Sequence, residues 1–305
     1  TVLAEWGKPE GNLMVPKRLP KARYELWKKL GILPRNIDRE IVDIMHRTCI
    51  GVDQDYKNIM KQGARASLAD LSGSWMASDL QDVMFGTPSP LISEANLGIM
   101  KQDHVNIIVH GHEPVLSEMV VAASQTAEML ELANKVGAKG IQLGGICCTA
   151  NEVLQRHGVP NAGNFLQQEL AIVTGACDAM VVDVQCVMQN LANVAKCFHT
   201  KLITTHPMAK MEQTNVHHIE FDEHHAMEDA VRIVTMAIEN FKNRGDNIQI
   251  PAHKENQVAG FSVENIKYHL GGTFRGTFYT LNDNIINGRI RGVAGVVGCN
   301  NARQK

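Results

Sequence analysis

Short apolar runs alternate with amphipathic stretches between about residues 103 and 242, and this pattern constrains the fold more than any other feature of the sequence. The apolar runs have the length of buried strands and are Val105–Val109, Gly140–Leu143, Ala179–Val184 and Leu202–Thr204. Apolar residues at helical spacing follow them, in Val115–Val136, Asn151–His157, Leu191–Cys197 and Ala226–Lys242. Such alternation is typical of a parallel sheet with helices on both faces. The sequence therefore predicts an α/β fold.

The regions on either side of this pattern predict further domains. Before residue 90 the sequence is mostly helical in character, with Asn36 placed to cap a helix and an amphipathic stretch over Ala64–Met84. After residue 246, a helix over Ser262–Leu270 and a strand over Val293–Val297 indicate a second α/β unit. We predict three domains: the C-terminal portion of a helical domain (1–90), a Rossmann-like α/β domain (91–245) and the truncated start of a second one (246–305).

Metal-binding side chains follow four of the predicted strands. In order along the chain they are His112, Cys148, Cys186 and Cys299. Parallel sheets bind ligands beyond the carboxyl ends of their strands, so these side chains are candidates for one site. A single cysteine there is usually a small buried residue, but cysteine is rare and recurs at three strand ends.

The residue types and their spacing indicate the kind of metal. Thiolates with one imidazole suit iron–sulfur, zinc or nickel. Structural zinc sites use closely spaced cysteine pairs, whereas these residues are separated by tens of positions, which favours a cluster. We expect the loops to lead into helix amino termini, where thiolates are favoured. We also expect four glycines to let the backbone approach an inorganic core, namely Gly111, Gly144, Gly145 and Gly298.

Several other functions lack support in the sequence. The formal net charge of −2 gives no electrostatic case for nucleic acid. No apolar run reaches the roughly 18 residues that span a bilayer, and no signal segment opens the chain. The nucleotide-binding glycine motifs and the G-x-S-x-G nucleophile turn do not occur. We therefore expect a cytoplasmic protein without a membrane span or a nucleic-acid partner.

Five segments resemble the catalytic subunit of the nickel-containing, anaerobic carbon monoxide dehydrogenases, which share the hybrid-cluster superfamily fold. They are SDLQDVMFGTP (78–88), HGHEPVLSEMVVAA (110–123), GGICCTANEVLQRHG (144–158), DAMVVDVQC (178–186) and RGVAGVVGCNN (291–301). The opening residues resemble the bacterial enzyme that partners acetyl-CoA synthase.

The resemblance implies a nickel–iron–sulfur active-site cluster held by one histidine and five cysteines. Matched residue by residue, His112 and Cys148 bind a pendant iron, and Cys186 and Cys299 bind the iron–sulfur core. Asp70 matches an aspartate that supports proton transfer. The other two cysteines would follow Lys305, and the ligands of the [4Fe–4S] relay clusters would precede Thr1. We therefore interpret the chain as an internal fragment of a longer polypeptide.

The activity that the resemblance implies is the reversible oxidation of CO with water to CO2, with electrons passed to ferredoxin. It also implies a homodimer and, in some members, an acetyl-CoA synthase subunit. Two alternatives stay open: a hybrid-cluster protein (hydroxylamine reductase), and a fragment without catalytic activity.

The remaining metal-ligand residue types are expected to have structural roles. His110 is predicted to support the site, and Cys147 to point away from it. A histidine cluster at 217, 218, 224 and 225 is predicted to be a solvated surface. Buried thiols are expected at Cys49, Cys177 and Cys197.

Overall fold

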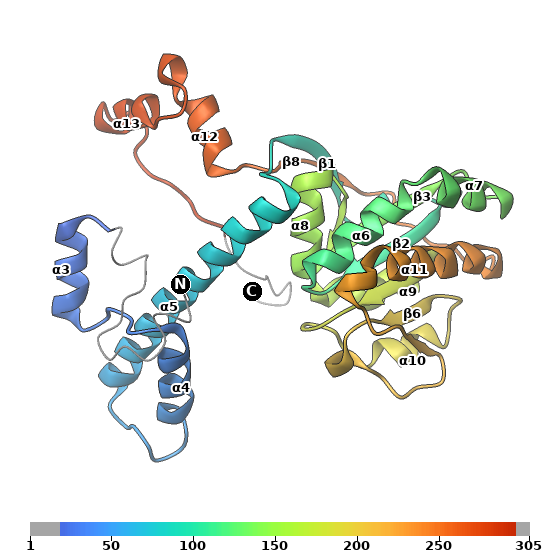
Figure 1. Ribbon diagram of the computed structural model, residues 1–305, viewed down its shortest axis with the longest axis horizontal. Coiled ribbons are helices and arrows are strands. Elements are labelled where there is room, and N and C mark those ends of the chain that lie inside the picture. The colour runs from blue at the N-terminus through green and yellow to red at the C-terminus, as the bar shows by residue number, and fades with distance from the viewer. Residues whose placement is uncertain (1–18, 297–305) are drawn as a thin grey trace. The chain divides into compact units, whose positions relative to one another are not determined.

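The computed structural model describes residues 19–296. The chain divides into two units, one up to Gly86 and the other from Thr87 on. The first contains the helices α3 (Lys21–Leu30), α4 (Ile37–Arg47) and α5 (Tyr56–Phe85), drawn in blue and cyan in Figure 1. As predicted, Asn36 caps α4, because its side-chain oxygen accepts from the Arg39 amide at 2.8 Å. This unit is helical, as the sequence predicted.

A buried carboxylate joins α4 to α5. Glu40 has no exposed surface, and its oxygens accept from Arg35 Nε at 2.8 Å, Gln62 Nε2 at 2.8 Å and Arg65 Nε at 3.1 Å. Burial alone would raise the pKa of Glu40, but the hydrogen bonds from Arg35 and Gln62 outweigh it and lower the pKa to about 2. The buried charge is therefore fully compensated.

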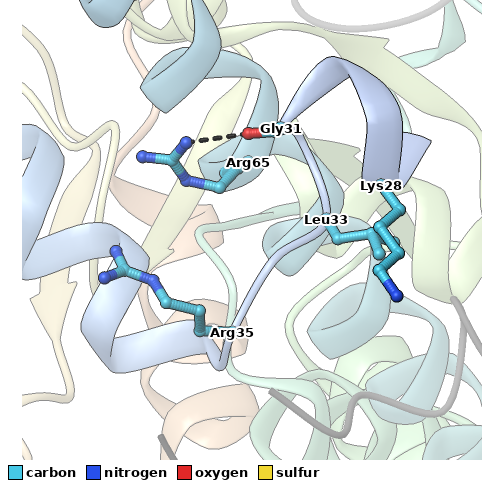
Figure 2. A pocket seen from close by; sticks show the side chains of 5 residues that line it. All are labelled: Lys28, Gly31, Leu33, Arg35 and Arg65. Atoms are coloured by element: carbon cyan, nitrogen blue, oxygen red, sulfur yellow. Dashed lines mark hydrogen bonds between the residues drawn. The ribbon is translucent and has the colours of Figure 1, made fainter. Parts of the chain in front are cut away.

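The same two arginines form one wall of an open pocket in this unit. The pocket is lined by Lys28, Gly31, Leu33, Arg35 and Arg65 (Figure 2). Arg65 Nη1 donates to the carbonyl of Gly31 at 2.9 Å. Both guanidinium groups are thus held in place by protein acceptors.

The second unit is built on an eight-stranded sheet with the order β7-β6-β5-β2-β3-β4-β1-β8. Neighbouring strands are parallel except for β1 and β8, which are antiparallel. The strands are β1 (Leu91–Ala95), β2 (Val105–His110), β3 (Ile141–Ile146), β4 (Asn161–Gly163), β5 (Cys177–Val182), β6 (Lys201–Thr204), β7 (Val216–His218) and β8 (Glu255–Ala259).

Helices lie between these strands along the chain, and α12, η6 and α13 follow the last strand, β8. The α-helices are α6 (Pro114–Ser124), α7 (Ala127–Lys135), α8 (Cys147–His157), α9 (Gln168–Val173), α10 (Leu191–Ala195), α11 (Ala226–Asn240), α12 (Val263–Leu270) and α13 (Tyr279–Ile286). The short 3-10 helices are η1 (Leu97–Ile99), η2 (Phe165–Gln167), η3 (Pro207–Ala209), η4 (Glu223–His225), η5 (Phe241–Asn243) and η6 (Gly272–Phe274).

Both faces of the sheet are covered, as the alternating pattern predicted (Figure 1). Ile107 and Val109 of β2 pack in one apolar cluster with α6, α7 and α11. Ile108, between them, packs in a second cluster with α9 and α10 on the opposite face. Successive side chains of a strand point to opposite faces, so β2 lies at the centre of the core.

The winding of the sheet reverses at one point. The chain passes from β2 to β3 on one side, and later returns to place β5 on the other side of β2. Ligands of open α/β sheets bind where the winding reverses in this way. The carboxyl ends of β2 and β5 therefore mark the place where a site is expected.

Two predicted elements were wrong. The helix expected over Val115–Val136 is interrupted, because Thr126 Oγ1 accepts from the Met129 amide and starts α7 as a new helix. The strand expected over Val293–Val297 is not formed in its described part, where Val293 and Val296 are 92% and 97% exposed. A strand needs a neighbour to pair with, and the sheet ends at β7 and β8.

The predicted domain boundaries can be compared with these units only in part. Residues 246–296 lie in the second unit, and β8 within them pairs with β1. A further domain beginning at residue 246 stays a prediction.

The Glu40 carboxylate gives a pH-dependent prediction. A pKa lowered from 4.5 to about 2 stabilises the folded state by about 3 kcal/mol at neutral pH. This stability is fully present above pH 4.5 and is lost as the pH falls towards 2. We expect Glu40→Gln to lower the free energy of unfolding by about 3 kcal/mol at pH 7 and by about 1 kcal/mol at pH 3, measured by urea denaturation.

Glu25→Gln, at an exposed position of α3, is the matched control and should change stability little at either pH. If Glu40→Gln lowered the free energy of unfolding equally at pH 7 and pH 3, the Glu40 charge would not be the source of this stability.

Candidate metal centre

Three adjacent strands end at the same level and bring three of the candidate ligands to one edge of the sheet. His110, the last residue of β2, is in register with Ile146 at the end of β3 and with Val182 at the end of β5. His112 follows β2, Cys148 lies in the first turn of the helix after β3, and Cys186 follows β5. The carboxyl edge of β3, β2 and β5 therefore carries one imidazole and two thiols.

A buried carboxylate ties two of these loops together. Asp183 is 2% exposed, and its Oδ1 accepts from the amide of His112 at 2.6 Å and also from that of Val184. Its Oδ2 accepts from the amide of Glu113 at 3.0 Å. The amides of His112 and Glu113 lie at the amino terminus of α6, where a negative charge is favoured. The loop after β2 is thus fixed to the end of β5.

Close packing explains the glycines around the site. Gly111 has φ 140, and a Cβ there would lie 1.9 Å from Asp183 Oδ1, so only glycine fits. A Cβ on Gly145 would lie 2.4 Å from the Cα of Ala150, and one on Gly144 would lie 2.9 Å from Ile108 Cδ1. We expected these three glycines to make room for an inorganic core. The expectation was wrong, because each makes room for protein atoms; Gly298 lies outside the described residues.

His112 is oriented for metal binding by its second ring nitrogen. Nδ1 lies 2.8 Å from the carbonyl oxygen of Val184. A carbonyl only accepts, so Nδ1 carries the proton and Nε2 keeps a lone pair. Metal-binding histidines usually donate their other N–H in this way. Val184 is thus the acceptor that the sequence did not reveal.

The adjacent cysteines face different surroundings. Cys147 is buried in the apolar cluster beneath the sheet edge, whereas Cys148 is exposed. This agrees with the expectation that Cys147 points away from the site. Cys148 is the second residue of α8, where backbone N–H groups and the helix dipole favour a thiolate.

Backbone strain gathers at the same edge. The described residues other than glycine with positive φ are Asn96, Cys147, Gln185 and Cys186. Three of these four lie just after β3 or β5: Cys147 at the start of α8, and Gln185 and Cys186 in the loop after β5, with φ values of 64, 65 and 56 degrees. Such conformations cost energy and cluster at functional sites. The strain is therefore an independent sign that this edge has a function.

Two ionisable side chains beside His112 are shifted towards their neutral forms. Burial lowers the pKa of His110, against the hydrogen bond with Gln168 and the charge of Asp183. Burial raises the pKa of Glu113, against the hydrogen bond from the Val115 amide. Glu113 caps α6 through that bond at 3.0 Å. Burial thus favours the uncharged forms of His110 and Glu113.

The remaining predicted residues have different outcomes. Asp70 is exposed on α5, in the first unit, and its role in proton transfer stays a prediction. Cys299 lies outside the described residues. Cys177 is buried as expected, and burial raises its pKa far above the usual range. Cys49 and Cys197 are exposed, so the prediction of buried thiols was wrong there: both follow short helices at the surface.

The residue types at this edge match those that hold metal clusters. Within residues 19–296, no three His, Cys, Asp or Glu side chains lie close enough together to hold one metal ion. The ligands of a cluster bind different metal atoms and stand further apart than those of a single ion. The edge carries one imidazole with an available lone pair and two thiols. These are ligand types of nickel and iron–sulfur centres.

Comparison with known proteins decides the family. The Prismane/CO dehydrogenase family matches residues 1–305. The chain belongs to this family. Carbon monoxide dehydrogenase 1 of Methanosarcina mazei is 52% identical over 304 residues, which are 99% of this chain and 48% of the relative. The carbon monoxide dehydrogenase/acetyl-CoA synthase subunit beta of Moorella thermoacetica is 42% identical over 287 residues, which are 93% of this chain and 42% of the relative.

Solved structures of the Prismane/CO dehydrogenase family share the fold. The nickel-free carbon monoxide dehydrogenase of Thermococcus sp. AM4 superimposes with a TM-score of 0.89 at 50% identity, over 98% of this chain and 47% of that chain. This chain spans about half the length of the curated relatives it matches. None of its described helices is both long and apolar enough to cross a membrane.

Sequence analysis missed the residues that support the site in this family member. Asp183 carried a signal, because an acidic residue directly follows the buried strand β5. Val184 carried none, because it contributes its carbonyl oxygen. Gln168 lies in a polar stretch, which gave no sign that its side chain is buried.

The fit of Gly111 against Asp183 can be tested by adding a single methyl group. We expect Gly111→Ala to lower the free energy of unfolding by at least about 3 kcal/mol, because the clash is added to the cost of a positive φ. Gly137→Ala is the control, since Gly137 has φ 92 and nothing lies within 4 Å of its Cβ position. It should cost about 1 kcal/mol. If urea denaturation shows the same loss of unfolding free energy for Gly111→Ala and Gly137→Ala, Asp183 does not crowd Gly111.

Proposed function

We propose that this chain is part of an anaerobic carbon monoxide dehydrogenase and supplies His112, Cys148 and Cys186 as ligands of a nickel–iron–sulfur cluster. Cys299 is proposed as a fourth ligand, from the resemblance alone. The level ends of β3, β2 and β5 support this most directly, because they bring an imidazole and two thiols from distant parts of the sequence to one edge. Membership of the family supplies the chemical class.

The cluster, when bound, supplies the redox and Lewis-acid chemistry for the reversible oxidation of CO with water to CO2. The chain orients its ligands. Val184 accepts the Nδ1 proton of His112 and so presents Nε2. Asp183 fixes the backbone of His112, and the first turn of α8 favours the thiolate form of Cys148. We assign Asp70 to the support of proton transfer.

The proposal extends to partners and location. In the full-length protein, [4Fe–4S] relay clusters would connect the site to ferredoxin as the electron acceptor, and we infer a cytoplasmic homodimer from the resemblance. The Moorella thermoacetica relative is named a carbon monoxide dehydrogenase/acetyl-CoA synthase subunit, which supports a place for this chain beside an acetyl-CoA synthase subunit. Relatives near 50% identity are named carbon monoxide dehydrogenases, which favours this activity over that of a hybrid-cluster protein. Nickel analysis of the full-length protein separates these two.

Loss of either ligand to the proposed iron site is the direct test. In the full-length enzyme, we expect His112→Ala or Cys148→Ala to lower CO-dependent dye reduction by at least about 100-fold. Most of the iron should be retained, because the remaining cysteines hold the core. The measurements are anaerobic turnover and the iron content per subunit.

Cys197→Ala is the matched control, since Cys197 is an exposed cysteine of the same unit. It should keep wild-type turnover and iron. Wild-type turnover in the His112 or Cys148 variant would refute the ligand assignment.

A further inference from the structure

One buried side-chain amide bonds to two backbone groups of the loop that carries Cys186. Gln168 begins α9 and has no exposed surface. Its Nε2 donates to the carbonyl of Cys186 at 3.1 Å and to that of Phe165 at 2.6 Å. Its Oε1 accepts from the amide of Met188 at 3.1 Å. The Gln168 side chain therefore bonds to the carbonyl of Cys186 and to the amide of Met188, two residues later.

The same amide reaches the end of the central strand. Gln168 Oε1 lies 3.1 Å from Nε2 of His110. Both partners of the Gln168 amide nitrogen are carbonyls, which only accept, so the orientation of the amide is fixed and Oε1 faces His110. His110 Nε2 therefore donates the proton in this contact. Gln168 thus uses its two donors and its acceptor oxygen to join the end of β2 to the Cys186 loop.

The backbone of this loop needs such support. Gln185 and Cys186 have φ values of 65 and 56 degrees, in the left-handed region that costs a residue with a side chain roughly 1 kcal/mol or more. Strained conformations persist only where the surroundings impose them. Cys186 is exposed, so the contacts of its backbone determine where its thiol points.

We propose that Gln168 is a positioning residue, which fixes the direction in which Cys186 presents its thiolate to the metal cluster. This rests on the proposed function. Gln168 does not touch the cluster. It acts by holding the carbonyl of Cys186 and the amide of Met188 in place, and it couples them to His110 at the end of β2, two residues before His112.

The neighbouring glutamine provides a matched control. Gln167 has the same side chain, and its Oε1 accepts from the amide of Asn164 at 2.9 Å to cap η2. Gln168→Met removes all four contacts with little change in volume, whereas Gln167→Met removes a contact that does not involve the Cys186 loop. Both variants, and the wild type, are made in the full-length enzyme under anaerobic conditions with nickel.

Two measurements test the proposal. In metal-free protein, hydrogen exchange of the peptide containing residues 183–190 should be at least tenfold faster in Gln168→Met than in Gln167→Met. In the metal-loaded enzymes, the paramagnetic resonance spectrum of the cluster should shift in Gln168→Met alone, with kcat for CO reduced at least tenfold and KM for CO changed less than twofold.

The outcomes are distinct. A Gln168→Met enzyme with the spectrum and turnover of Gln167→Met overturns the proposal, even if exchange is faster, because the loop is then loosened without effect on the cluster. A wild-type enzyme that lacks nickel and CO turnover refutes the proposed function itself, and with it the role of Gln168 towards a cluster. Exchange in metal-free protein then still shows whether Gln168 anchors the loop.

Discussion

The carboxylate of Asp183 is the interaction on which the arrangement of the site depends. It accepts from the amides of His112 and Glu113 on one loop and from its own neighbour Val184 on the other. A buried carboxylate with several N–H donors is strongly stabilised, and one without them is costly. The two loops therefore form together or not at all. Gly111 allows this approach, since any side chain there would occupy the position of Asp183.

The Asp183 carboxylate joins the two loops at the carboxyl end of the central strands of the sheet. β2 is central, buried on both faces, and flanked by β3 and β5 with level ends. The winding reverses at this strand, which is where ligands of open α/β sheets bind, and Asp183 joins the loops after β2 and β5. On this rigid base, the loops supply an oriented imidazole, a thiol at a helix amino terminus and a thiol on strained backbone. Rigid elements with strained loops at one edge are a general way to preorganise a metal centre.

The central strands of the sheet and the candidate ligands after them were predictable from the sequence. The strands β2, β3, β5 and β6 are apolar runs bounded by turn residues, and the candidate ligands come shortly after three of them. The strand β4 was not predicted, because Asn161 and Gly163 have low strand propensity and pair only through tertiary context. The order of strands was not predictable, since the position of β5 beside β2 depends on contacts between distant segments. Gln168 was missed for the same reason: its partners lie far along the chain, and glutamine in a polar helix start gives no signal of burial.

Anomalous X-ray scattering at the iron and nickel edges from crystals of the full-length protein tests the central claim most directly. The account predicts metal peaks at the carboxyl edge of β3, β2 and β5, with iron about 2.0–2.1 Å from His112 Nε2 and metal about 2.3 Å from the sulfurs of Cys148 and Cys186, as for comparable metal–ligand bonds. Metal peaks remote from these three side chains, or a His112 ring turned so that Nε2 bonds to protein, would contradict it.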